Sequence, residues 1–222
     1  MKNIRKKFIE AGIEFAIFLI FTVFVKLKNV AAIGPLGSSV GLSSINKAIF
    51  DIFGENKMWE TLTEIIGFVS IAIAFGFCLL GVCQLIKRRS LFKVDHSILL
   101  LGAFYVLVGI VYVFFEIVVI NYRPILVDGA LEASYPSSHT MLVVCIMASA
   151  MIATKDIFKD KKTFILVSNV LLSLMLGLTV AGRLLSGVHW FTDIIGGVMI
   201  STALTTLYGA FVDLVTHKKG LK

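Results

Sequence analysis

Five ionisable residues stand out because they lie at the ends of long apolar runs, where such side chains are rare. They are Arg123, His139, Arg183, His189 and Asp193. An ionisable residue beside or inside an apolar helix is by default a candidate for function. The i, i+4 spacing of His189 and Asp193 predicts that the two side chains share one helix face. A carboxylate in that position would hold the imidazole in one tautomer and raise its basicity.

Phosphoryl transfer is the chemistry that this set of residues suits. Arginine supplies a planar fork of donors for phosphate oxygens, and the start of a helix, as at Ser137 and Ser138, supplies free backbone N–H groups. A neutral His189 held by Asp193 could attack phosphorus in line, and a protonated His139 could give a proton to the leaving oxygen. Because the sequence has no cluster of carboxylates for a two-metal site, we expect neither a metal nor another cofactor.

Taken singly, each of these residues also has an explanation without function. An arginine at the end of a membrane span commonly extends to the lipid headgroups, a histidine beside Trp190 suits an interfacial aromatic belt, and two serines after Pro136 form an ordinary helix N-cap. Asp193 is harder to explain in this way, because it lies one turn inside an apolar helix. The five residues occupy four helix ends at one membrane level, which favours a joint site.

The composition indicates which elements must hold these residues. Of the 222 residues, 58% are hydrophobic and 16% are charged, with a mean hydropathy of +0.94, whereas a soluble domain has about 25% charged residues. A transmembrane helix needs about 20 apolar residues. The sequence therefore predicts an all-α membrane protein, one domain over residues 1–222, with six transmembrane helices in one bundle. The predicted spans are 8–28, 62–86, 97–121, 139–155, 163–183 and 189–212.

The basic residues predict the orientation of the bundle. The net charge is +7, but the Lys and Arg residues form short clusters between apolar runs, which indicates membrane topology and no nucleic acid partner. Fifteen of the 21 lie at the N-terminus and in the segments 87–93, 155–162 and 218–222. The positive-inside rule then places both termini in the cytoplasm. The segments expected to face outward are 29–61, 122–138 and 184–188.

The N-terminal segment and the first outward loop leave alternatives. A basic start followed by an apolar run also fits a signal peptide, but Lys26 and Lys28 interrupt the run where a small-residue cleavage site would be needed, which favours a retained helix. In the loop 29–61, the stretches 49–53 and 59–66 mix apolar, acidic and aromatic residues. They predict either an amphipathic helix on the outer leaflet or a plain connector.

Three short motifs resemble those of the type-2 phosphatidic acid phosphatase family, the lipid phosphate phosphatases of the acid phosphatase and vanadium haloperoxidase superfamily. The family motifs are K-x6-R-P, P-S-G-H and S-R-x5-H-x3-D. They correspond here to residues 116–124, 136–139 and 182–193. The resemblance covers about residues 116 to 193, and the six-helix layout of the family agrees with the predicted spans.

The resemblance implies a role for each matching residue. His189 would be the nucleophile that forms a phosphohistidine, and Asp193 would orient it and stabilise its charge. His139 would be the general acid on the leaving group and would later help to activate water. The phosphate oxygens would be bound by Arg123, Arg183, Ser137 and the backbone N–H groups around Ser138 and His139.

Three positions depart from the family motifs. Ser138 replaces Gly, Gly182 replaces Ser, and Glu116 replaces Lys. The last change is the most serious, because it exchanges a hydrogen-bond donor for an acceptor. Glu116 and Arg123 are seven residues apart, so on a continuous helix they would share one face. We expect Glu116 to pair with Arg123 or Arg183 or to meet a polar part of the substrate; the alternative is that Glu116 lies off the site and the role of the Lys is lost.

The implied function is that of a metal-independent phosphatase acting on a lipid phosphate or polyprenyl diphosphate at the outer face of the cell membrane. From His139 the apolar run extends for 15 residues, about 22 Å as a helix. This is shorter than the hydrocarbon core of about 30 Å. The site is therefore expected slightly below headgroup level, within reach of a lipid that moves sideways.

The same residues also fit other functions. A catalytically weak or inactive relative that binds phospholipid, or an accessory subunit, would account for Glu116. A lipid phosphotransferase would use the same histidines on another acceptor. A transporter or channel would need ionisable groups at several depths, whereas these gather at one face. The sequence determines neither the particular lipid nor the oligomeric state.

Overall fold

The computed structural model of the chain describes residues 1–220, with side chains described as far as residue 218. This part contains seven α-helices and two 3-10 turns, and its only β-type pairings are isolated bridges in loops. The helices are α1 (Lys2–Leu27), α2 (Ser43–Phe53), α3 (Lys57–Arg88), α4 (His96–Ile117), α5 (Ser138–Ile157), α6 (Lys162–Ser186) and α7 (Phe191–Gly220).

Six helices of the described chain are long and apolar enough to cross a membrane, and in order they match the six predicted spans. The remaining helix, α2, is too short to do so. The all-α prediction is therefore confirmed, and the chain is a multi-pass membrane protein. The outward sides of α3, α4 and α6 expose large apolar side chains such as Phe68, Val106 and Leu166, as helices in contact with lipid do.

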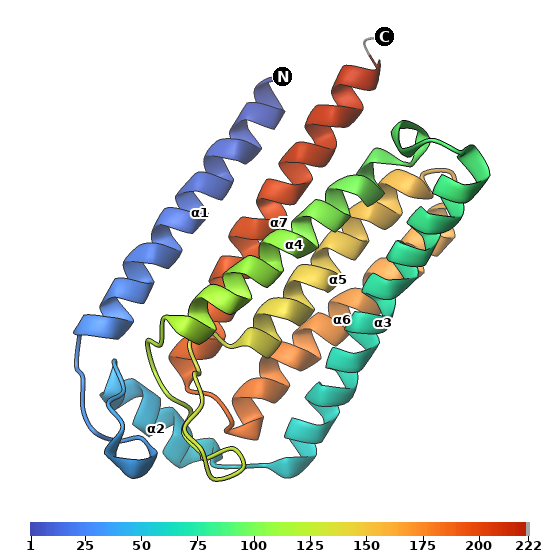
Figure 1. Cartoon of the computed structure of the whole chain (residues 1–222). Helices are drawn as coiled ribbons and strands as arrows, with labels where there is room; N and C mark the ends of the chain where they lie inside the picture. Colours follow the sequence, from blue (N-terminus) through green and yellow to red (C-terminus); the bar gives the residue numbers. More distant parts are fainter. Residues whose placement is uncertain (221–222) are drawn as a thin grey trace.

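The long helices form a bundle around α5. Both termini lie at one end of this bundle, and α2 lies with the long loops at the other end (Figure 1). We call the second end the α2 end. Helix α5 packs against α3, α4, α6 and α7, and most of its residues between Thr140 and Thr154 are buried. Because α5 begins at the α2 end, its first residues lie where the ends of several other helices meet.

Several predicted span ends differ from the helix bounds, and two of these lie next to candidate residues. Helix α4 ends at Ile117, earlier than the predicted end at 121, and α7 begins at Phe191, later than the predicted start at 189. Arg123 and His189 therefore lie in connecting segments and not on the helices. The expectation that Arg123 and Glu116 share one helix face is wrong for the same reason.

A capping box explains where α7 begins. Oδ2 of Asp193 accepts a hydrogen bond from the Trp190 N–H at 2.9 Å. This bond caps the N-terminus of α7 at Trp190. The buried Asn46 of α2 completes the cap, because its Oδ1 accepts a hydrogen bond from the Thr192 N–H at 3.1 Å. The start of α7 thus depends on a residue that is 146 positions away in the sequence.

The loop 29–61 is only in part what the sequence indicated. A helix does form there, but it is α2, which packs against α6 and α7. The second predicted stretch, 59–66, belongs to the first turns of α3, which the side chain of Asn56 caps by accepting from the Met58 and Trp59 N–H groups. The plain connector is thus wrong for residues 43–53, whose helix covers the start of α7.

Backbone hydrogen bonds join the helix ends at the α2 end. The N–H of Ser137, just before α5, donates to the carbonyl oxygen of Asp193 in α7 at 2.8 Å. The N–H of Asn56, just before α3, donates to the carbonyl oxygen of Ser186 at the end of α6 at 3.0 Å. These two bonds join the ends of four helices in two pairs, α5 with α7 and α3 with α6, and the candidate residues lie on or beside these ends.

Candidate active site

The imidazole of His189 lies in a buried polar cluster between α6 and α7. Its Nδ1 is 3.0 Å from Oγ of Ser134. The same hydroxyl donates a hydrogen bond to Oδ2 of Asp193 at 2.5 Å. His189, Ser134 and Asp193 are 3%, 2% and 0% exposed. Asp193 therefore reaches the histidine through the serine hydroxyl, and this differs from the direct contact that the i, i+4 spacing predicted, because His189 precedes the helix.

The other ring nitrogen of His189, Nε2, is buried and has no hydrogen-bond partner among the described residues. Burial and the neighbouring positive charges of Arg123 and Arg183 lower the pKa of His189 well below its usual range. The ring is therefore neutral at physiological pH. A neutral imidazole whose Nδ1 is hydrogen-bonded and whose Nε2 has no hydrogen-bond partner is the form that can act as a nucleophile.

Every oxygen of the Asp193 carboxylate is engaged. Oδ2 accepts hydrogen bonds from the Ser134 hydroxyl and from the Trp190 N–H. Oδ1 accepts a longer one, 3.4 Å, from Nδ2 of Asn121. A buried carboxylate without such donors would be costly. The donors come from the segment after α4 and from the start of α7, so this carboxylate holds two parts of the chain together.

His139 and Arg183 meet at one residue of α3. The ring Nε2 of His139, in the first turn of α5, lies 2.7 Å from the carbonyl oxygen of Thr63. Because a carbonyl only accepts hydrogen bonds, Nε2 bears the proton in this contact. Arg183, 4% exposed near the end of α6, donates through Nη1 to Oγ1 of Thr63 at 3.2 Å. Thr63 thus places an imidazole and a guanidinium group on the same side of α3.

Both arginines keep buried donors available. Nε of Arg183 and Nε of Arg123 have no hydrogen-bond partner in the described part of the chain. Nε of Arg123 does lie 3.2 Å from Oε2 of Glu132, but only as an ion pair without hydrogen-bond geometry. The charges of both arginines act on His189. Guanidinium groups with buried N–H donors that are not used in hydrogen bonds favour the binding of an anion.

Glu116 does not pair with either arginine. Its carboxylate forms no ion pair within the described residues, and the partner of Arg123 is Glu132. Glu116 lies exposed in the last turn of α4, where it lines a small cavity together with Ser134 and Ser138. The predicted ion pair is wrong because the chain leaves the helix at Ile117, after which Arg123 follows a different path.

Ser137 in the second motif and Gly182 in the third also have structural roles. Ser137 is the N-cap of α5, and its side chain accepts a hydrogen bond from the Thr140 N–H at 3.4 Å. Gly182 stands where the family motif has serine, and a Cβ added there would lie 2.6 Å from Cγ2 of Thr63. The close approach of α6 to α3 thus leaves no room for a side chain at Gly182.

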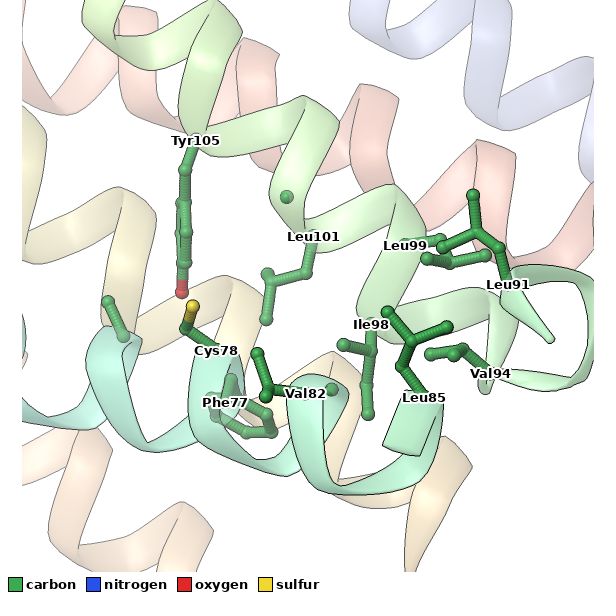
Figure 2. Close-up of a pocket in the computed structure, with 13 residues that line it drawn as sticks. Phe77, Cys78, Val82, Leu85, Leu91, Val94, Ile98, Leu99, Leu101 and Tyr105 are labelled. Atoms are coloured by element: carbon green, nitrogen blue, oxygen red, sulfur yellow. The ribbon is translucent and has the colours of Figure 1, made fainter. Parts of the chain in front are cut away.

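Two larger cavities open between helices, and only one of them reaches the candidate residues. A cavity of about 260 Å³ between α3 and α4 is lined almost entirely by apolar side chains such as Phe77, Leu101 and Ile98 (Figure 2). It lies toward the turn between these helices, away from the α2 end. The other, of about 380 Å³, lies between α3 and α5 and is lined by Glu64, Gly67, Phe68, Ser70, Ile71, His139, Leu142 and Val143. We call it the α3–α5 groove.

Sequence reasoning missed three residues that organise this cluster. Ser134, Asn121 and Thr63 are all buried, and each bonds to one of the predicted residues. The signal for Asn121 and Ser134 was their place just outside an apolar run, beside Arg123 and before Pro136. Thr63 gave no signal, because a threonine in an apolar helix is ordinary.

The fold and the cluster together define a class of protein. It is a multi-pass helical membrane protein in which two histidines, two arginines and one aspartate gather at one end of the bundle. Residues 117–216 match the sequence profile of the PAP2 superfamily. Among curated proteins, none matches the chain.

A solved structure has the same fold. It is the crystal structure of a transmembrane PAP2-type phosphatidylglycerolphosphate phosphatase from Bacillus subtilis, with a TM-score of 0.59 and 19% sequence identity. The alignment covers 94% of this chain and 96% of that chain. The profile match and the shared fold agree with the resemblance that the three motifs indicated.

Proposed function

We propose that this protein hydrolyses a lipid phosphate or polyprenyl diphosphate at the extracytoplasmic face of the cell membrane, through a phosphohistidine on His189. One observation supports this most strongly. Nε2 of His189 is buried and open, while Nδ1 is tied through Ser134 to Asp193 and the charges of two arginines act on the ring. This arrangement suits in-line attack on a phosphorus atom whose oxygens bind to Arg123 and Arg183.

In the first step, Nε2 of His189 forms a bond to phosphorus and the bond from phosphorus to the leaving oxygen breaks. The leaving alcohol or phosphate takes a proton from His139. When His139 is protonated, both ring nitrogens are donors; Nε2–H is held by the Thr63 carbonyl, so Nδ1–H is the proton to deliver. The positive charge that develops on His189 is balanced by Asp193 through Ser134.

In the second step, His139, now neutral, takes a proton from a water molecule. The water oxygen attacks phosphorus, the phosphorus–nitrogen bond breaks, and inorganic phosphate leaves. Arg123 and Arg183 stabilise the phosphoryl oxygens in both steps, so charge stabilisation requires no metal ion. Ser137, Ser138 and the free N–H groups at the start of α5 supply further donors.

The α3–α5 groove favours a lipid substrate. His139 lines one end of it, and the exposed apolar side chains of Phe68 and Ile71 line its wall. Because α3 and α5 are both membrane-spanning segments, an alkyl chain in this groove would lie among the lipid chains while its phosphate reached His139. The excess of basic residues at the end of the bundle with the termini supports an outward-facing α2 end.

A substrate panel tests the proposal. With the purified chain in detergent micelles, we expect phosphate release from phosphatidic acid, phosphatidylglycerol phosphate or a polyprenyl diphosphate. We expect a kcat/KM at least about tenfold above that for glycerol phosphate, because a buried alkyl chain adds binding energy. Release should persist in EDTA. Absence of release from every lipid in the panel would favour the accessory or lipid-binding alternative that Glu116 suggested, and transfer to an added alcohol in place of water would favour a phosphotransferase.

A glycine-to-alanine change tests the placement of His139. A Cβ added at Gly67 in α3 would lie 2.5 Å from Cε1 of His139 and 2.9 Å from its Nε2, so the ring must move away from Thr63. We expect Gly67→Ala to lower kcat by about 10- to 100-fold, since a misplacement of about 1 Å has effects of this size. The matched control is Gly76→Ala in the same helix, where a Cβ meets nothing within 4 Å in the described structure. Equal activity of the two variants would contradict the placement of His139.

A further inference from the structure

We propose that Ser134 is a positioning residue for the nucleophile: its hydroxyl accepts a hydrogen bond from Nδ1–H of His189, donates its own proton to Asp193, and thereby leaves the lone pair of Nε2 open toward phosphate. The inference rests on the proposed function, because it assigns the tautomer in which His189 attacks. It replaces the direct contact between His189 and Asp193 that the sequence suggested.

Ser134 has one O–H donor, and this donor points to Oδ2 of Asp193, 2.5 Å away. Nδ1 of His189 is 3.0 Å from the same oxygen. Since the only proton of the hydroxyl is already donated, the hydrogen bond between these two atoms requires the proton to lie on Nδ1. A neutral imidazole with Nδ1–H has its lone pair on Nε2.

The contacts of Asp193 show why the hydroxyl donates in that direction. The carboxylate also receives the Trp190 N–H and the Asn121 amide N–H. Both of these N–H groups can only donate a hydrogen bond. They therefore suit an ionised carboxylate, whose oxygens only accept hydrogen bonds. An ionised Asp193 cannot supply a proton to Ser134, so the hydroxyl must be the donor in that pair.

The surroundings of His189 keep its ring neutral, with a single proton. The charges of Arg123 and Arg183 both act on His189 and disfavour a second proton on the ring. With the one proton on Nδ1, the lone pair lies on the buried Nε2, which has no hydrogen-bond partner among the described residues. This lone pair is therefore present before any phosphate binds.

The backbone holds Ser134 where this role requires it. Its N–H donates to the carbonyl oxygen of Asn121 at 2.9 Å. The neighbouring residues of these two, Tyr122 and Ala133, form an antiparallel bridge. The side chain of Asn121 in turn accepts a hydrogen bond from the Gly41 N–H at 3.0 Å. The loop between α4 and α5 thus delivers a hydroxyl to a position between two side chains of the last motif.

The tautomer of His189 can be measured without any assay of activity. The chain contains four histidines, so in protein labelled with ¹⁵N-histidine the His189 signals are assigned by their loss in His189→Asn. We expect a protonated Nδ1 and an unprotonated Nε2 in the wild-type protein at neutral pH. A protonated Nε2 would overturn the proposal, whether or not Ser134 variants fold. If His189→Asn keeps full phosphatase activity, the proposed function fails while this measurement still decides the role of Ser134.

Kinetics of Ser134 variants give the second readout. We expect Ser134→Ala to lower kcat by about 10- to 100-fold, the size expected for one hydrogen bond to a charged group, with KM changed by less than about threefold because Ser134 does not touch the phosphate. The fraction of His189 with Nδ1–H should fall in the same variant, and Ser134→Thr, which keeps the hydroxyl, should recover most of the lost kcat. Ser149→Ala is the control, since Ser149 is a buried serine of α5 bonded to Ile146 and Tyr105. Wild-type kcat and an unchanged tautomer in Ser134→Ala would refute the inference.

Discussion

Replacement of His189 by asparagine should lower kcat for release of inorganic phosphate by about 10⁴-fold or more, the loss typical of removing a covalent nucleophile. Asparagine keeps a polar group of similar size in a site that is only 3% exposed, so the bundle should remain folded. The loss follows from the state of Nε2, which is buried and has no hydrogen-bond partner in the described chain, so that its lone pair is available to bond to phosphorus. The measurement is phosphate release from a short-chain lipid phosphate by protein in detergent.

The intermediate provides a direct check of this prediction. Rapid quenching with ³²P-labelled substrate should trap a phosphorylated protein that is stable in base and labile in acid, as a phosphoramidate is. The label should be absent from His189→Asn and present in His217→Asn. His217 is a matched control because it lies at the opposite end of the same helix, α7. Label that persists after substitution of His189 would show that another residue is the nucleophile.

Replacement of Arg183 by lysine should be nearly as damaging as its removal. Lysine keeps the charge but loses the planar fork that binds two oxygens at once. Arg183 is 4% exposed, uses Nη1 to bond Thr63, and has an unpartnered Nε within the described structure. We expect kcat/KM to fall by about 10²-fold in Arg183→Lys and by about 10³-fold in Arg183→Gln, in the range found for lost oxyanion donors.

Inhibition by orthovanadate separates binding from folding in these variants. The inhibition constant should rise in both, because vanadate would occupy the place of the phosphoryl group. Arg88→Lys and Arg88→Gln are the controls, since Arg88 ends α3 at the opposite end of the bundle, where it pairs with Asp95. If vanadate bound equally well to Arg183→Gln and to the wild type, Arg183 would have no part in the oxyanion site.

The environment of Glu116 illustrates where prediction from local spacing fails. Seven residues separate it from Arg123, and on a helix the two would face one another. The helix ends at Ile117, and Arg123 instead lies beside Glu132, with which it also shares a backbone hydrogen bond of 3.1 Å. The end of α4 depends on the contacts of the following loop with the rest of the chain, and these contacts have no pattern in the local sequence.

The sequence by itself determined the class of protein and most of the candidate site. Six apolar runs of sufficient length define six membrane helices, because backbone groups in lipid must be hydrogen-bonded internally and a helix does this within one run. The same apolar background makes Arg123, His139, Arg183 and Asp193 conspicuous, since each would be costly there without a purpose.

Only the tertiary structure decided how these side chains are connected. It placed the hydroxyl of Ser134 between His189 and Asp193 and brought both His139 and Arg183 into contact with Thr63. It also set the end of α4 and the start of α7, neither of which the apolar pattern marked. The physical reason is the length scale of the interactions. Hydropathy acts over neighbouring residues, whereas the hydrogen bonds of Ser134 and Thr63 to the motif residues join positions that are 55 to 120 residues apart.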